Sequence, residues 1–146
     1  MNCSSKNPRY KSTVMTNNSS SQTIGNAAAP LTLLGTAVTN TGVAINPEAS
    51  SISVTYPGTF LITADVIFTA TTAGQITLQL YSDGVVLPET VTTITAPIGA
   101  TAINTSTIRR LVPNCQNPIN VQVYVNTDGT AVGNVTKVVT KAIKLG

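Results

Sequence analysis

The sequence contains no histidine and no tryptophan, and only two of its 146 residues are cysteines. Without histidine the chain lacks the side chain that most often serves as a general base or metal ligand near neutral pH. No two carboxylates stand at a spacing that suggests acid–base catalysis, and no acidic cluster suggests a calcium site. The sequence therefore predicts a protein that is not an enzyme and that has no cofactor or metal.

Charged residues are scarce as well. They make up 9% of the chain, against about 25% in an average soluble domain, and this composition favours an extracellular or particle-bound protein over a cytosolic enzyme. With two phenylalanines, four tyrosines and no basic stripe within the expected sheet, nucleic acid is not an expected partner. No segment approaches the roughly 20 apolar residues of a membrane-spanning helix. The sequence thus predicts a protein that binds neither nucleic acid nor membrane.

The few charges are unevenly distributed along the chain. Between the two ends, two arginines stand against five acidic residues, which gives the centre a net charge of −3. The basic ends either only keep the chain soluble or meet an acidic surface, which electrostatic attraction favours at low salt. The lysines and arginines of the two ends, where no acid occurs, are Lys6, Arg9, Lys11, Lys137, Lys141 and Lys144.

The N-terminal residues show no targeting signal and no framework of disulfides. Two free thiols are the simplest expectation for Cys3 and Cys115, although a bond between them is geometrically possible. The first residues hold no 7–15-residue apolar core, so we expect no signal peptide. Residues 1–22 are polar and are predicted to form an N-terminal arm, with one domain over residues 23–146.

The segment from Ser51 to Leu87 predicts β-strands most clearly. The dipeptide Asp83-Gly84 within it predicts a type I′ hairpin, in which both central residues have positive φ. Apolar residues also recur at every second position there, a period that places them on one face of a sheet. They are Phe60, Ile62, Ala64, Val66 and Phe68, followed by Ile76, Leu78 and Leu80.

The rest of the chain predicts more strands and no helix. Apolar or β-branched runs at 31–38, 43–45, 90–96, 101–111, 119–126 and 135–145 are separated by turn residues. No 3.6-residue period holds across three turns. About ten short strands at near-regular spacing predict an all-β sandwich or barrel.

Some residues on the predicted outer faces are apolar or aromatic. Leu61 and Ile67 lie opposite the main apolar row of their strand, and Tyr81 and Tyr124 lie on the polar sides of theirs. A sheet that is partly apolar on both faces needs a cover on both, and in a chain without helices a second subunit can supply it. We therefore expect these four residues at a subunit interface, although the tyrosines could instead stack on a sugar.

Three other charged residues, Asp65, Arg109 and Arg110, lie within predicted strands, and their surroundings can be interpreted from that position. Asp65 lies within the long predicted strand, where it either faces a subunit interface or polar network or is a surface carboxylate. Arg109 and Arg110 are consecutive in a predicted strand, so they point to opposite faces. One is expected to be exposed and the other paired.

The segment from Val54 to Phe68 resembles the core signature of C1q/TNF-like jelly rolls. There an aromatic-x-Gly-x-aromatic turn, here Tyr56 to Phe60, leads into a long central strand, and Gly74 to Gly84 resembles the next strand and hairpin. The chain is also similar to small C1q-like proteins of phages and prophages. With these it shares a Cys-containing N-terminal arm, the start Tyr10-Lys11, Cys115 in a loop, and the end Val138 to Lys141.

The resemblance covers about residues 31–145 and implies a jelly roll of about ten antiparallel strands that forms a homotrimer. Since the phage proteins are head fibres or capsid decorations, it implies a non-enzymatic structural protein of the virion surface. The arm, with Lys6, Arg9, Tyr10 and Lys11, would dock on the major capsid protein or another virion protein. The alternative is a C1q-like module that adheres to a cell surface or binds a host glycan. The sequence lacks the collagen-like repeat of many cellular C1q proteins, which argues against complement-type and spore-surface functions.

Overall fold

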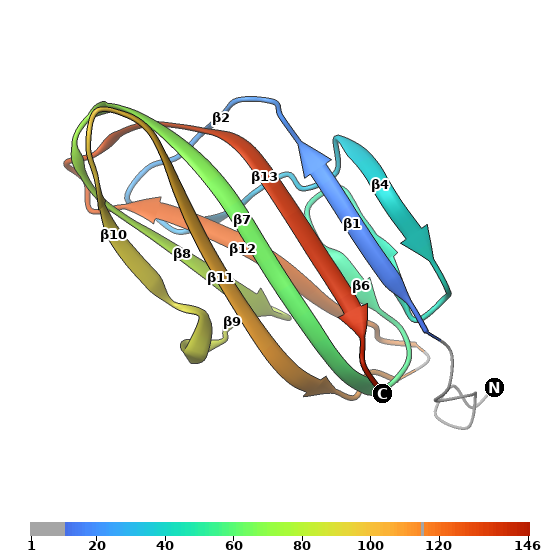
Figure 1. Ribbon diagram of the computed structural model, residues 1–146. Coiled ribbons are helices and arrows are strands. Elements are labelled where there is room, and N and C mark those ends of the chain that lie inside the picture. The colour runs from blue at the N-terminus through green and yellow to red at the C-terminus, as the bar shows by residue number, and fades with distance from the viewer. Residues whose placement is uncertain (1–10, 115) are drawn as a thin grey trace.

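The computed structural model describes residues 11–114 and 116–146, with only the backbone at positions 37 and 38. Cys3, Lys6, Arg9, Tyr10 and Cys115 lie outside the described residues. The described chain forms two antiparallel sheets, A and B, packed face to face as a sandwich (Figure 1). No helix among the described residues is long and apolar enough to span a membrane.

Sheet A contains the longest strands. Its order is β11 (Gly99–Leu111), β7 (Gly58–Thr72), β13 (Val132–Lys144), β1 (Thr13–Asn18) and β4 (Thr36–Thr41), with β2 (Gln22–Thr23) paired to β13. Sheet B has the order β10 (Thr92–Ala96), β8 (Gly74–Ser82), β12 (Ile119–Thr127), β6 (Ile52–Val54) and β5 (Ile45–Pro47), with β3 (Ala29–Pro30) on β12 and β9 (Val85–Val86) on β8. Apart from the three two-residue strands, ten strands remain, as the sequence predicted. One turn of 3₁₀-helix, η2 (Pro88–Thr90), precedes β10.

The two strands of the central segment belong to different sheets. β7 lies in sheet A and β8 in sheet B, so the chain crosses from one layer to the other at Ala73. All eight of the predicted core residues of these strands are at most 1% exposed. The predicted hairpin at Asp83-Gly84 is confirmed, since φ is +48° and +79° at these two residues.

The sequence prediction of an arm up to residue 22 is wrong for Thr13–Asn18. This segment is β1, which lies inside sheet A between β13 and β4. Its inward residues are Val14, Thr16 and Asn18, of which only the first is apolar. The strand therefore shows no hydrophobic alternation, and it is the pairing with distant strands that places it in the sheet.

The strand predicted for residues 31–38 is displaced toward the C-terminus. β4 begins only at Thr36, while Leu31 and Leu33 are buried in a segment without regular structure. Side-chain bonds support this segment, because the amide of Gln22 bonds to both the N–H and the carbonyl of Thr32. The prediction that a strand begins at Leu31 is therefore wrong, although Leu31 and Leu33 are buried.

Candidate binding surfaces

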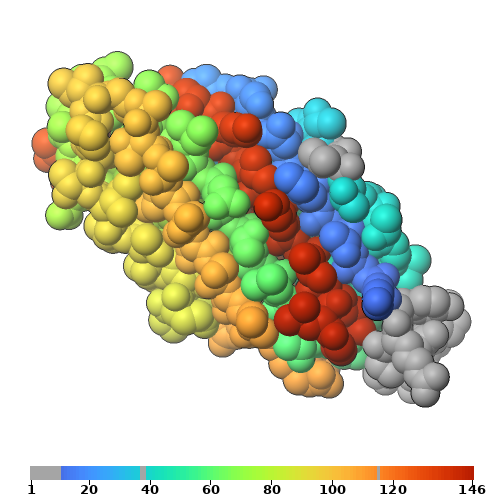
Figure 2. Space-filling view, viewed as in Figure 1, coloured from blue at the N-terminus to red at the C-terminus, as the bar shows by residue number. Residues whose placement is uncertain are grey.

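The outer face of sheet A is partly apolar. Leu61 and Ile67 on β7 are half-buried there, together with Met15 on β1 and with Val139 and Ile143 on β13. Figure 2 shows this face, on which β11, β7, β13, β1 and β4 lie side by side. Because a solvent-facing side of an antiparallel sheet is normally polar, this face has the character of a surface that is covered.

Two adjoining hollows, of about 420 and 400 Å³, lie over this face. Both are lined by Asp65, Asn104 and Lys141, and the second also by Lys137. Asp65 is exposed and no ion pair within 4.0 Å joins it to either lysine. The face therefore combines apolar side chains with both signs of charge.

Two polar atoms on the same face are buried without a hydrogen bond in the described structure. They are Oδ1 of Asn17 on β1 and Oγ1 of Thr63 on β7. Most buried polar atoms in proteins have a partner, which can be a water or a group of a second molecule. Such atoms are consistent with a surface that is completed by another chain.

The outer face of sheet B carries a stacked pair of tyrosines. The rings of Tyr81 on β8 and Tyr124 on β12 have centroids 3.8 Å apart and an interplanar angle of 20°. Antiparallel pairing brings them together, since Tyr81 lies opposite Gln122, and Tyr124 lies opposite Gln79. Both tyrosines stay partly exposed.

Amide side chains hold the surroundings of this pair. Gln79 is only 9% exposed, and its Nε2 donates to Oδ1 of Asn126 over 2.9 Å. The amide nitrogen of Asn126 in turn donates to the carbonyl of Asn26, in the loop before β3. A rigid amide row therefore lies beside Tyr124.

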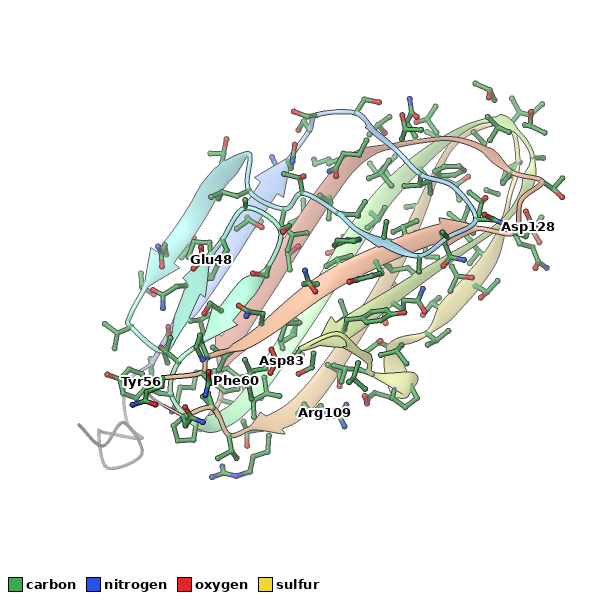
Figure 3. The ribbon with its side chains drawn as sticks, turned by 180° about the vertical axis from the view of Figure 1, so that it is seen from behind. Glu48, Tyr56, Phe60, Asp83, Arg109 and Asp128 are labelled. Carbon is green, nitrogen blue, oxygen red and sulfur yellow. The ribbon has the colours of Figure 1, made fainter. Side chains whose placement is uncertain are left out.

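A polar groove of about 490 Å³ lies next to the tyrosine pair, because one of its lining residues, Gln122, pairs with Tyr81. Its lining includes Gln122, Asn120, Ser51 and the carboxylates of Glu48 and Asp83. Figure 3, which views the molecule from the sheet B side, shows Glu48 toward one end, Asp128 at the other and Asp83 between them. Oδ1 of Asp83 accepts the N–H of Asn120, which fixes one wall of the groove.

Charge is divided between the two sheets. The strands of sheet B contain no Lys, Arg, Asp or Glu, and four acids lie in the turns that end them: Glu48, Asp83, Glu89 and Asp128. The described lysines and arginines lie in the strands of sheet A or, for Lys11, just before β1. The sheet B side is therefore acidic, whereas sheet A carries the described basic residues together with one acid, Asp65.

Arg109 and Arg110 fulfil the expectation for consecutive strand residues. Arg110 is exposed, whereas Nη1 of Arg109 lies 2.8 Å from Oε1 of Glu89 in η2. Both partners of this ion pair are substantially exposed, so its contribution to stability is small.

Backbone hydrogen bonds lower the pKa of Asp128. Its carboxylate accepts the N–H groups of Ala131, Thr130 and Gln75, which stabilise the charged form in that order of effect. The side chain fixes the turn between β12 and β13. This structural role accounts for the shift.

The structure separates the four residues predicted for a subunit interface. Leu61 and Ile67 lie on the outer face of sheet A, and Tyr81 and Tyr124 on that of sheet B, so they do not form one continuous surface. Of the predicted docking arm, Lys11 is described and is exposed next to β1. The sequence prediction missed Met15, which lay within the supposed arm, and Val139 and Ile143. The alternation at 139–143 was a signal for the latter two.

No group of three or more His, Cys, Asp or Glu residues that could hold a metal ion occurs within residues 11–114 and 116–146. Both surfaces are instead suited to binding, one by apolar contact and the other by aromatic and amide groups.

No family model and no curated protein sequence matches the chain. Solved structures do match. The globular domain of the zebrafish complement 1qA protein aligns with a TM-score of 0.60 at 12% identity, covering 93% of this chain and 97% of that one. Murine APRIL at pH 8.5 aligns with a TM-score of 0.59 at 11% identity, covering 93% and 100%. The fold is thus the C1q/TNF-like jelly-roll sandwich that the sequence predicted.

Proposed function

We propose that this chain is a non-enzymatic structural protein that forms a homotrimer on the surface of a phage particle, as a head fibre or capsid decoration. The observation that carries the proposal is the half-buried apolar patch on the outer face of sheet A. The C1q/TNF-like fold supports a trimer, and the sequence resemblance to small C1q-like phage proteins supports the virion surface. Formation of the trimer and binding to the capsid are two separate steps.

The outer face of sheet A is the proposed trimer contact. Leu61 lies opposite Ile143 in the β7–β13 pair. Ile67 lies three outward positions further along β7, beyond Thr63 and Asp65, so the apolar side chains form two groups on this face. Burial of such residues stabilises by about 25 cal/mol per Å². Contact with another subunit would also give Asn17 and Thr63 hydrogen-bond partners, which they lack in the isolated chain.

The proposed capsid contact lies at the N-terminal end. The start of β1 and the C-terminus lie at the same end of the sandwich, where Thr13 pairs with Ile143 (Figure 1). Lys11 is exposed there, and Lys6, Arg9 and Tyr10 precede it. Basic residues at this end suit an acidic capsid surface, with binding that weakens as salt rises.

The trimer is tested by light scattering on the full chain and on Leu61→Glu. The unchanged protein is expected at three times its chain mass, and the variant at one, because a buried carboxylate without a partner opposes association. Thr95→Glu, on an exposed position of β10 in sheet B, is the matched control and should stay trimeric. A monomeric unchanged protein would contradict the proposal.

The capsid contact is tested by co-sedimentation with capsids that lack this protein. Only residues 1–10 should be deleted, because a deletion that extends past residue 12 would remove part of strand β1. The truncated protein is expected to keep its trimer mass and to lose binding. If it sedimented with capsids as the full chain does, docking through the arm would be wrong.

A second candidate function is adhesion to a glycan. The stacked pair Tyr81–Tyr124, with its amide neighbours, favours it. Since the pair lies on sheet B, this function is compatible with a trimer formed through sheet A.

A further inference from the structure

We propose that the outer face of sheet B binds a neutral oligosaccharide, at the pair Tyr81–Tyr124 and along the groove beside it. The inference rests on the second candidate function proposed above, adhesion to a glycan, and adds the class of sugar; it depends on neither the trimer nor the arm. It rests on three features: an exposed aromatic pair, a row of amides and carboxylates, and the absence of basic side chains from this sheet.

The tyrosine pair provides the apolar part of the site. Each ring stacks on the other with one face, and both side chains remain partly exposed. The C–H face of a pyranose ring packs well on an aromatic ring, and the phenolic hydroxyl can donate or accept at its edge. Neither ring needs to reorganise, because the stack and the Gln79–Asn126 bond already hold the surroundings of Tyr124.

The groove provides the polar part. Gln122 lies opposite Tyr81 and also lines the groove, so the groove adjoins the tyrosine pair. The groove holds the carboxylates of Glu48 and Asp83, and in the described structure no hydrogen bond occupies Oδ2 of Asp83 or either oxygen of Glu48. Carboxylate and amide groups are suited to the vicinal hydroxyls of a sugar, because together they accept and donate. A volume of about 490 Å³ has room for more than one sugar ring.

The charge of the groove and of the sheet B strands indicates which class of sugar this face would bind. The sheet B strands contain no Lys or Arg, and the groove contains two acids. A uronate or sialylated glycan would bring its carboxylate toward Glu48 and Asp83 without a cation to neutralise it, which is unfavourable. The site is therefore expected to prefer neutral glycans.

The test is NMR titration of the full chain, with its tyrosine rings labelled, against cellohexaose, chitohexaose, mannohexaose and hexagalacturonate. The four tyrosines make the spectrum simple to assign. At least one neutral hexamer is expected to shift the Tyr81 and Tyr124 signals saturably, with a Kd below about 1 mM, and the galacturonate at least tenfold more weakly. No saturable shift with any neutral hexamer would overturn the proposal, and so would equal binding of the galacturonate.

Variants locate the site. Tyr124→Ala and Gln122→Ala are expected to weaken binding at least fivefold, and the second keeps the inference testable if the first fails to fold. Thr95→Ala is the control on the same face, because strand β8 separates β10 from the groove. Light scattering on each variant separates this proposal from the trimer: if Tyr124→Ala folds but loses oligomer mass, the pair is a subunit contact and the inference is wrong.

Discussion

Thr16 and Thr140 lie opposite each other in the β1–β13 pair, both almost fully buried, and the hydroxyl oxygen of neither has a hydrogen-bond partner in the described structure. Two adjacent unpaired hydroxyls in a core oppose folding, because each loses its water without compensation. Thr16 belongs to β1, in which two of the three inward residues, Thr16 and Asn18, are polar.

Thr140→Val is expected to stabilise the protein by about 1 kcal/mol, since it removes the hydroxyl and keeps the branched shape. Chemical unfolding of the variant measures the change. Thr90→Val is the matched control, because the Thr90 hydroxyl donates to the carbonyl of Leu87 and accepts the N–H of Leu80. The free energy of unfolding of that control should fall by about 1–3 kcal/mol. Destabilisation by Thr140→Val would mean that its hydroxyl has a partner after all.

Removal of β1 is expected to unfold the domain. A chain without residues 1–10 should keep the unfolding midpoint of the full chain, whereas one without residues 1–18 should lose cooperative unfolding, because β13 and β4 both lose their partner in sheet A. Thermal unfolding followed by circular dichroism measures both. A stable protein that starts at residue 19 would return Thr13–Asn18 to the predicted arm.

Gly133→Ala is expected to destabilise strongly, by several kcal/mol. A Cβ there would clash with the Thr69 carbonyl oxygen and come within 2.8 Å of the Phe68 ring, and a backbone oxygen in a sheet cannot readily move aside. Gly25→Ala is the control, with nothing within 4 Å of its Cβ. Urea unfolding of both variants should differ clearly, and equal midpoints would show that β13 can shift to accommodate the methyl group.

The lowered pKa of Asp128 predicts a pH dependence. A carboxyl group whose pKa is lower in the folded than in the unfolded state stabilises the fold above the unfolded pKa, near 4. This stabilisation is lost as pH falls from there through the folded pKa. Asp128→Asn should therefore unfold at a lower temperature than the unchanged protein at pH 7, and the difference should narrow by pH 2. A difference that stays constant with pH would assign the effect to hydrogen-bond geometry.

The sequence by itself determined the fold class and most of the core. In β7, β8 and β12 the apolar residues alternate, and a period of two in a chain without helical periods leaves few architectures other than an antiparallel sandwich. The hairpin at Asp83-Gly84 was equally local, because its backbone conformation depends on those two residues. The outward positions of Leu61, Ile67, Tyr81 and Tyr124 followed from the same alternation.

Only the tertiary structure decided which outward residues belong together. The alternation of apolar residues shows that a side chain lies on an outer face, but not which of the two sheets carries it. The crossing from β7 to β8 places Leu61 and Tyr81 on opposite sides of the sandwich. The pair Tyr81–Tyr124, the strand β1 and the separation of basic from acidic residues all arise from pairing between distant segments. Such pairing depends on the register of the whole sheet, which no short stretch of sequence contains.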